Sequence, residues 1–477
     1  MIRNFLSLLA IVIVSGAAAQ NYHAVNGSPY AGSLGVHNNP ASILMAPDKW
    51  DITLLGVQGK ITTNTFTIHN YSYLSNPYRS QYKVDDGDYK RFGYTSANLN
   101  ILNARIAIGK KSAIAFGANL KSYANINSSS YYFIDTLKST GDFFKINDPG
   151  NTYSAQFNSS NWVELFATYS RTIIDDWRGR LNAGITVKVN KGLASGRAEL
   201  LDGGYQRVGD NRYNIPTGYF GYFYSSNLDP WIDDNGGSKS FSNFMKYTDG
   251  GISFDAGIEY IVNPGEISFY DDPDNFYDYD WKFGASLLDA GFTSYRYGSQ
   301  SHSASGVRPD VTNVQLDNTF DSTIQSLNQF NDSLAGIVAD FPGMSGRYSM
   351  INPMRIVLNA DHFLGNHFYV NAELSLNVPG DWLKKWYSVK EMNLVTVTPR
   401  WEKRTLGVYL PVQYTNKGKL LVGAAFKAGP VLLGLHNLSN LFVKTSVQNG
   451  GGYLAIVIRN PKGHSKKSDK RLDCPTP

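Results

Sequence analysis

The histidines are the residues best suited to acid–base, nucleophilic or metal chemistry, and in this chain they are scattered. The eight are His23, His37, His69, His302, His362, His367, His436 and His464. None belongs to an H-E-x-x-H zinc motif, and the sequence has no G-x-S-x-G nucleophile elbow and no phosphate-binding loop. We therefore expect no enzyme, no catalytic residue, no metal site and no cofactor. A Ser/His arrangement assembled from distant strands stays open, since triads are recognised by geometry.

One acidic cluster has oxygen ligands of the kind that Ca²⁺ takes. It consists of Asp271, Asp272, Asp274, Asp278 and Asp280. The cluster lacks the glycine and the spaced glutamate of a calcium-binding loop. A solvated acidic turn is the preferred interpretation.

Charged side chains also occur at regular places between apolar ones. Lys188 lies between Val187 and Val189, and Glu373 lies between Ala372 and Leu374. If the apolar set faces lipid, the opposite set lines a barrel interior, and it comprises Lys121, Glu164, Lys188, Asp255, Glu259, Glu373 and Lys419. Two interpretations stay open, because these charges could pair across the lumen and close it or could line a conducting channel.

The elements that position these charges are strands of strict period two. Apolar residues alternate with polar ones from 181 to 190, from 252 to 260 and from 367 to 378. Such runs are close to the roughly 9 to 11 residues that a tilted strand needs to cross a bilayer. A soluble sandwich also alternates, but its strands are usually shorter, about 5 or 6 residues.

The connections between the strands sort by length. The strands are predicted near 51–64, 94–108, 112–126, 159–173, 181–200, 249–262, 281–297, 353–364, 367–378, 391–402, 404–414, 419–427, 431–440 and 451–459. Connections such as 109–111 and 365–366 are short, whereas 127–158 and 298–352, on the other side, are long. Short periplasmic turns and long extracellular loops are typical of bacterial outer-membrane barrels. The sequence predicts an all-β fold, a transmembrane antiparallel outer-membrane β-barrel of about 14 strands.

Composition agrees with this fold and excludes other classes. Aromatic residues make up 13% of the chain and charged residues 17%, which excludes a disordered chain and a coiled coil. The net charge of +5 is concentrated near the ends, so no basic face for nucleic acid is expected. No apolar run after residue 20 approaches the length of a transmembrane helix.

Four regions are predicted along the chain. Residues 1–19 have a basic, an apolar and a small-residue part in the order of a signal peptide, and residues 461–477 form a basic periplasmic tail. Residues 49–460 form the barrel. Residues 20–48 are rich in turn-forming residues and are expected to plug the lumen, although a loose periplasmic extension stays open. The candidate plug residues are Ser28, Pro29, Gly32, Gly35, Asn38, Asn39 and Pro40.

Several motifs resemble those of a known family. They are the segment from Ser28 to Ser42, Phe283–Gly291, Ile351–Met354, Thr398–Arg404, Leu410–Val412 and Gly423–Pro430. In this order they resemble a family of Bacteroidota outer-membrane barrels of undetermined function, itself similar to the FadL-like long-chain fatty-acid transporters. The resemblance implies about fourteen strands, an N-terminal plug and uptake of a hydrophobic molecule.

The functional expectation is passive uptake of a small hydrophobic molecule across the outer membrane of a Gram-negative cell, with both termini periplasmic. The alternative is a non-transporting structural or scaffolding subunit of a secretion or envelope-assembly complex. Its motivation is the charged lumen and the basic tail, which carries Lys462, Lys466 and Lys467. Expected partners are outer-membrane lipid, a small hydrophobic ligand and a protein bound through the tail, but not nucleic acid.

Overall fold

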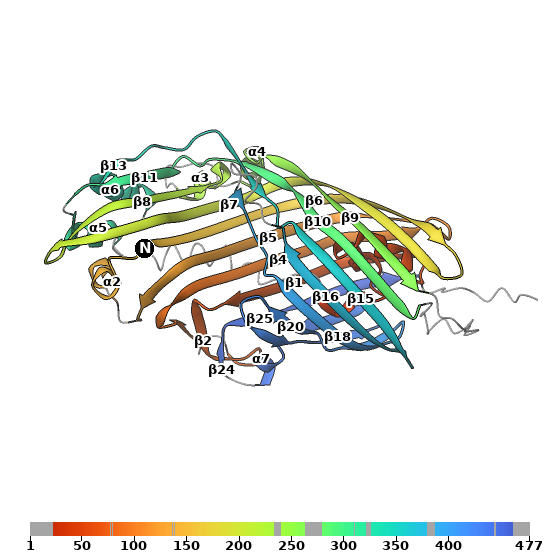
Figure 1. The fold of residues 1–477 in the computed structure, drawn as a ribbon. Helices are drawn as coiled ribbons and strands as arrows, with labels where there is room; N and C mark the ends of the chain where they lie inside the picture. The colour runs from red at the N-terminus through yellow and green to blue at the C-terminus, as the bar shows by residue number, and fades with distance from the viewer. Residues whose placement is uncertain are drawn as a thin grey trace, which may run out of the picture.

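A computed structural model describes most of the chain. The described residues are 22–76, 78, 80–135, 137, 139–232, 240–262, 279–309, 311–320, 326–378, 387–442 and 445–460. No helix within these ranges is long and apolar enough to cross a membrane. The structure is built instead from one large antiparallel sheet that closes on itself (Figure 1).

Fourteen strand passages form the closed wall, which confirms the predicted fold. They are β1 (Trp50–Thr63), β4 (Gly87–Ala107), β5 (Ser112–Phe133), β6 (Tyr153–Asp175), β7 (Gly179–Gly209), β9 (Gly250–Val262), β10 (Trp281–Arg296), β15 (Arg355–Gly365), β16 (Phe368–Asn377), β18 (Leu394–Glu402), β19 (Leu406–Tyr409) continued by β20 (Val412–Thr415), β21 (Leu420–Val422) continued by β22 (Ala424–Ala428), β23 (Val431–Leu435) and β25 (Asn449–Arg459). Each pairs with the next, and β1 pairs with both β4 and β25, so the ring has no free edge.

The two ends of the barrel differ. At one end most connections are tight, as between β15 and β16, where Asn366 and His367 both have positive φ. The longer exception at this end joins β9 to β10. At the other end the chain makes long excursions. We call these the short-turn end and the long-loop end. β1 begins and β25 ends at the short-turn end, so the described chain enters and leaves the barrel there.

The long excursions form a lobe with its own secondary structure. Its strands are β2 (Phe66–Tyr71), β3 (Gln81–Val84), β8 (Arg212–Tyr224), β11 (His302–Val307), β12 (Val311–Thr312), β13 (Val338–Asp340), β14 (Arg347–Ile351), β17 (Tyr387–Ser388) and β24 (Thr445–Val447). Its helices are α2 (Thr140–Ile146), α3 (Asp229–Ile232), α4 (Phe241–Lys246), α5 (Asn313–Phe320), α6 (Leu327–Ile337), α7 (Ser439–Phe442) and the 3₁₀ turn η5 (Ser226–Leu228). A packed aromatic core that includes Tyr205, Tyr213 and Phe330 joins β8, β11, β12, β13, α2, α5 and α6. The strands β2, β3 and β24 form a separate three-stranded sheet.

Alternation separates the two faces of the wall. On β6, Glu164 is buried, whereas its neighbour Leu165 is 60% exposed; on β7, Lys188 is buried between Val187 and Val189, which are 42% and 61% exposed. The same pattern around the ring leaves an apolar belt outside and a polar interior, since side chains of a strand alternate between its faces. This is the arrangement that lipid requires of a barrel.

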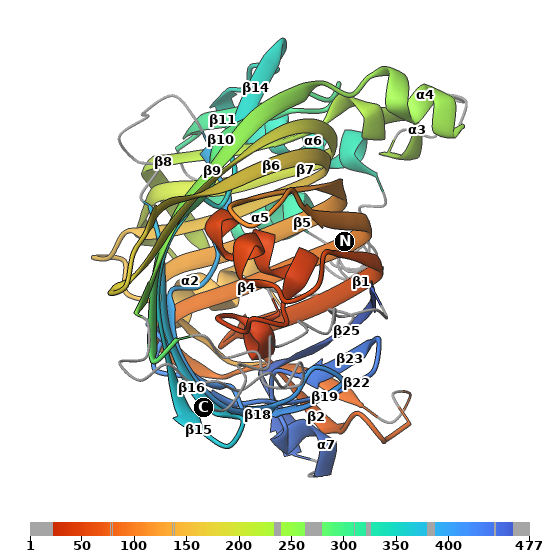
Figure 2. The ribbon, with the colours of Figure 1, turned by 90° about the vertical axis from the view of Figure 1, so that its right-hand side faces the viewer.

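The N-terminal residues lie inside the ring. Three 3₁₀ turns, η1 (His23–Val25), η2 (Gly32–His37) and η3 (Pro40–Met45), precede β1. Figure 2 shows these turns, coloured red, surrounded by barrel strands. Nearly all residues from 22 to 45 are buried. We call residues 22–46 the plug.

Candidate functional site

The plug is an uncharged segment within a charged wall. From Tyr22 to Ala46 the sequence contains no Asp, Glu, Lys or Arg. The wall around the plug carries buried charges of both signs, described below. An uncharged segment can bind such a wall only through amides, hydroxyls, imidazoles and backbone groups, because a buried polar group needs a hydrogen-bond partner.

Local sequence explains how the plug folds so tightly against the wall. Gly32 has a φ of +57°, and a Cβ there would lie 2.5 Å from Asp51 Oδ1, so only glycine fits this position. Asn39 caps η3 by accepting a hydrogen bond from Ala41 N at 2.9 Å, and Pro40 occupies the first position of the turn. The free amide of Asn39 donates to the backbone oxygen of Ile258 on β9.

The seven predicted plug residues all lie on this segment and are all buried. Ser28 donates to Glu402 Oε2 at 2.7 Å, and Asn38 donates to Glu373 Oε2 at 2.9 Å. Pro40 presents its backbone oxygen to the Ser170 hydroxyl at 2.6 Å. Wall strands on several sides of the ring thus bind the plug.

Three clusters of buried charged side chains on the wall make up the candidate site. The first centres on Glu373 of β16. Its Oε2 accepts from the amides of Asn26 and Asn38 at 2.8 and 2.9 Å. Its Oε1 lies 3.5 Å from Nδ1 of His23. Two amides and an imidazole of the plug therefore converge on one wall carboxylate.

A second group centres on Arg400 of β18. Its guanidinium forms a bidentate pair with Asp361, at 2.6 and 2.8 Å, and its Nε lies 3.2 Å from Glu402. Glu402 also accepts from Lys427 at 2.8 Å. Together with the Ser28 hydroxyl, these contacts tie the plug to a completed ion-pair network, the form in which buried charge is tolerated.

The third group joins β5, β6, β7, β9 and β10. Lys121 lies 2.8 Å from Asp289 and 3.2 Å from Glu164, and Lys188 lies 2.6 Å from Asp289 and 2.7 Å from Asp255. Asp289 is thus shared by both ammonium groups. It has a φ of 53° and lies in a β-bulge of β10, which turns its side chain inward.

The predicted lumen residues fall into two sets. Six are buried on the inner face of the wall, namely Lys121, Glu164, Lys188, Asp255, Glu259 and Glu373. Lys419 lies apart from them, in the turn between β20 and β21 at the long-loop end, half-buried, with its Nζ donating to Gln448 at 2.8 Å. A turn residue does not keep the strand alternation, so its parity does not predict the direction of its side chain.

Sequence reasoning missed several buried wall charges. They are Asp51, Lys60, Arg105, Lys282, Asp289, Arg355, Asp361, Arg400, Glu402 and Lys427. Most of them occupy positions of their strands whose side chains point inward. The same alternation, followed along every strand, could have found them. Asp289 could not be found in this way, because the bulge interrupts the period.

His37 connects the plug to a row of asparagines. Its Nε2 lies 3.0 Å from Asn100 Nδ2 and 2.9 Å from Asn103 Nδ2, so it accepts from both amides and must be unprotonated. Burial, reinforced by the nearby positive charge of Lys121, lowers the pKa of His37 to about 3. The imidazole is therefore neutral in the docked plug.

The neutrality of His37 gives a pH prediction. Because the pKa is lower in the docked plug than the ordinary value of 6.5, protons favour the undocked state, so docking weakens as the pH falls below about 6.5 and continues to weaken towards 3. Ring ¹⁵N spectra should show a neutral imidazole protonated on Nδ1 at pH 5. His37→Gln, which cannot titrate, should flatten this part of the pH dependence. A protonated ring at pH 5 in the docked state would contradict the prediction.

A second closure lies nearer the long-loop end. The chain between β16 and β18 turns into the lumen, where Lys390 N donates to Asn125 Oδ1 of β5 at 3.0 Å and Glu391 pairs with Arg355 at 2.7 Å. We call residues 387–393 the inward segment. Val389 packs in an aromatic layer drawn from β5, β6, β8, β10 and β14, whose buried members are Tyr123, Trp162, Phe223, Tyr295, Tyr348 and Met350. The plug and the inward segment thus occupy the lumen at two successive levels.

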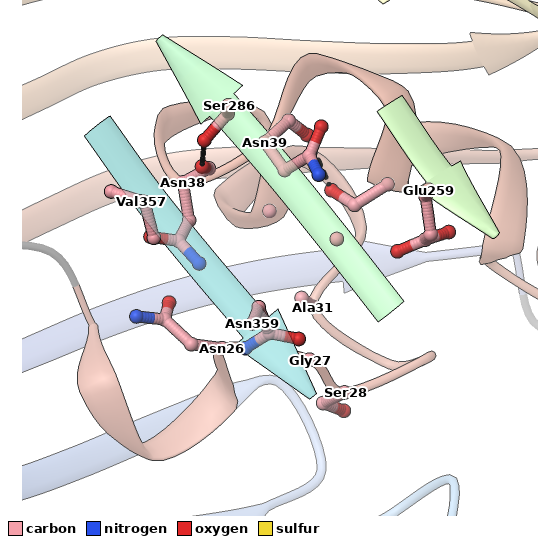
Figure 3. Close-up of a pocket in the computed structure, with 13 residues that line it drawn as sticks. Asn26, Gly27, Ser28, Ala31, Asn38, Asn39, Glu259, Ser286, Val357 and Asn359 are labelled. Carbon is pink, nitrogen blue, oxygen red and sulfur yellow. Dashed lines mark hydrogen bonds between the residues drawn. The ribbon is translucent and has the colours of Figure 1, made fainter. Parts of the chain in front are cut away.

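The space left beside the plug is small. A cavity between the plug and strands β9, β10 and β15 has about 20 Å³ available to the centre of a water molecule, room for about one water. Figure 3 shows Asn26, Asn38 and Asn39 of the plug facing Glu259 and Asn359 of the wall across it. Its lining mixes polar side chains with apolar ones such as Ala31 and Val357, and its volume is too small for a ligand larger than water.

The acidic cluster is only partly described. Asp271, Asp272, Asp274 and Asp278 lie outside the described residues. Asp280 is described, and its backbone oxygen lies 2.9 Å from Nδ1 of His362. Among the residues that the structure does cover, no three His, Cys, Asp or Glu side chains form a metal-binding group.

The chain has a weak similarity to several solved structures. The toluene transporter TbuX of Ralstonia pickettii is 10% identical, with 90% of this chain and 94% of that chain covered and a TM-score of 0.40. A FadL homologue of Pseudomonas aeruginosa is 9% identical, with 93% and 98% covered and a TM-score of 0.39. The toluene transporter TodX of Pseudomonas putida is 11% identical, with 93% and 94% covered and a TM-score of 0.37.

Family membership comes from the sequence. No curated protein matches it. The model of a family of unknown function, DUF5723, matches residues 40–436, which run from η3 of the plug to the end of the β23 region and cover well over half of the chain. This agrees with the resemblance to a family of undetermined function. The chain that forms this plugged barrel therefore belongs to the DUF5723 family.

Proposed function

We propose that the protein is an outer-membrane channel that is closed at rest and takes up a small hydrophobic molecule when its plug moves. The observation that carries the proposal is the lumen itself: an uncharged plug is bound to wall carboxylates by neutral groups, below an aromatic layer. Water can replace the hydrogen bonds that neutral groups of the plug donate to charged groups of the wall. The plug can therefore leave its site without breaking an ion pair of its own.

The aromatic layer supports the choice of an apolar substrate. Trp162, Tyr295 and Tyr348 offer buried ring surface that an apolar molecule can contact. The charged half of the lumen beyond this layer is unfavourable for an apolar molecule, because ion pairs would lose their solvation or their partners. The proposed route therefore begins at the long-loop end, and it continues past the aromatic layer only when the plug moves.

The location and orientation are part of the proposal. The apolar belt supports a location in a membrane, and the outer membrane is where closed barrels of this kind are found. The short-turn end faces the periplasm in this orientation, so both ends of the chain are periplasmic. The signal peptide at 1–19 and the basic tail at 461–477 lie outside the described residues and remain predictions. The proposal assigns no enzymatic activity to the chain.

A reversible lock on the plug tests the proposal. The hydroxyls of Ser33 in the plug and Thr53 on β1 are 2.8 Å apart and both buried. Ser33→Cys with Thr53→Cys should form a disulfide when oxidised, in a Cys474→Ser background that removes the native cysteine. Oxidation is expected to abolish uptake of radiolabelled toluene and fatty acid by cells that express the protein, and reduction to restore it.

The controls are the two single-cysteine variants, which cannot form the lock. Their uptake should not respond to oxidant. If cells that express the unlocked protein take up neither compound faster than cells without it, apolar uptake is wrong. If uptake occurs but does not respond to the lock, the plug is not the element that moves.

A scaffolding role is the second candidate, and the ion pairs within the lumen favour it. Arg400, Asp361 and Glu402 satisfy one another without any solute. A subunit of a secretion or envelope-assembly complex needs no open state. Purification in mild detergent, with and without residues 461–477, should then show a stoichiometric protein partner that is lost with the tail. A lone barrel in both preparations would contradict this role.

A further inference from the structure

Two short helices of the lobe expose aromatic side chains beside the barrel wall. We call residues 229–232 and 240–247, which contain α3 and α4, the arm. Trp231 is 42% exposed, Phe241 78% and Tyr247 47%. The rings of Trp231 and Phe244 meet edge to face, with centroids 5.6 Å apart, so the two helices share one aromatic surface. Figure 2 shows α3 and α4 outside the ring of strands. They lie in the chain between β8 and the start of β9, at the long-loop end.

The arm adjoins the apolar belt. Tyr247 precedes the first residue of β9, Gly250, by three positions, which is roughly 10 Å of chain at about 3.3 Å per residue. The first outward side chains of β9, Ile252 and Phe254, are 41% and 42% exposed and belong to the belt. The exposed surface of the arm therefore continues a surface that already faces lipid.

The rim between the arm and the belt has an excess of positive charge. Asp249 Oδ2 lies 3.1 Å from Nε of Arg296 and 3.1 Å from Nε of Arg347, so one carboxylate is shared by two guanidinium groups. Arg347 is 67% exposed, and Lys246 ends α4 next to this group. An excess of cations at this level attracts anionic phosphate groups, most strongly at low ionic strength.

We propose that the arm lies in the surface of the lipid layer at the long-loop end, with Trp231, Phe241 and Tyr247 at the boundary between headgroups and acyl chains. Arg296 and Arg347 bind lipid phosphates beside it. Trp and Tyr favour this boundary because their rings are apolar and carry a polar group. The inference rests on the membrane location given under the proposed function, and it extends the lipid contact beyond the barrel strands.

Lipid-dependent quenching of a fluorophore tests the inference. In the Cys474→Ser background, the variants Phe241→Cys, Phe254→Cys and Val314→Cys each carry one bimane label. Phe254 reports the belt, and Val314 on α5 is a matched exposed apolar residue elsewhere on the lobe, 67% exposed. Each variant is placed in phosphatidylcholine vesicles with and without brominated acyl chains. All three side chains are exposed, so the variants should fold.

Quenching at position 241 is expected to approach that at 254 and to exceed that at 314 several-fold. Quenching at 241 no greater than at 314, with strong quenching at 254, would overturn the inference and leave the membrane location intact. If 254 is not quenched, the membrane location fails, and the inference fails with it. If position 241 is protected from an aqueous quencher only when a protein that co-purifies with the barrel is present, the arm binds that protein and the inference is wrong.

The role of the arginines has its own measurement. Replacing part of the phosphatidylcholine with phosphatidylglycerol is expected to increase quenching at position 241, and Arg296→Gln with Arg347→Gln should abolish this increase. High salt should have the same effect, because it screens exposed charges. An increase that persists in the double variant would contradict phosphate binding at this rim.

Discussion

Removing the plug and the inward segment together is expected to turn the closed barrel into an ion-conducting pore. Deletion of residues 22–46 exposes the charged side chains that surround the plug, such as Glu373, Arg400 and Asp361, to water. Replacing residues 387–393 with a glycine-serine segment removes Val389 from the aromatic layer and Glu391 from its ion pair with Arg355. The remaining interior is lined with charged and polar groups that hydrate readily, which is the condition for a water-filled lumen.

Each change alone should leave the barrel closed, because the other closure lies in series with it. Planar-bilayer recordings are the measurement: discrete conductance steps are expected only for the combined variant. Retention of β-sheet circular dichroism and of heat-dependent migration on gels controls for folding. Conductance after deletion of the plug alone would show that the inward segment does not seal the lumen. No conductance in a folded combined variant would contradict the two-closure description.

Replacing Arg105 is expected to have the largest effect on stability of any single substitution considered. Arg105 on β4 is 1% exposed, and its Nε lies 2.5 Å from Asp51 Oδ2. It also donates to the backbone oxygens of Ile43 and Asp48. One guanidinium therefore links β1 and β4 to the plug and to the residues that connect the plug to β1. Arg105→Leu leaves a buried carboxylate without its counter-ion. Breaking a buried pair in this way costs about 3–5 kcal/mol of unfolding free energy.

An exposed ion pair provides the matched control. Lys83 and Asp86 form a 3.0 Å pair in the lobe, with side chains 43% and 45% exposed. Lys83→Ala should leave the unfolding free energy nearly unchanged, because water replaces the lost partner. Urea titration in lipid vesicles measures both variants under the same conditions. Equal, small effects for Arg105→Leu and Lys83→Ala would show that the Arg105 pair is hydrated rather than sealed by the plug.

Strand alternation is a local property, and it allowed the barrel to be predicted. The direction of a side chain on a strand depends only on its position along that strand, so the apolar and charged residues around Lys188 and Glu373 already predict an outer and an inner face. Turn length is also local, which is why the fourteen passages and the two unlike ends could be predicted without a structure. Lys419 shows the limit of this reasoning, because it belongs to a turn.

Partners within the lumen could not be predicted, because closure of the ring decides them. Asn26 and Glu373 are 347 residues apart in sequence but 2.8 Å apart in the structure. The stagger of fourteen strands sets which inward side chains face one another, and a single bulge such as that at Asp289 changes the result. The sequence by itself determined that charges point inward. Only the tertiary structure decided that they pair with one another and with an uncharged plug, because pairing depends on distances across the barrel and not on period along a strand.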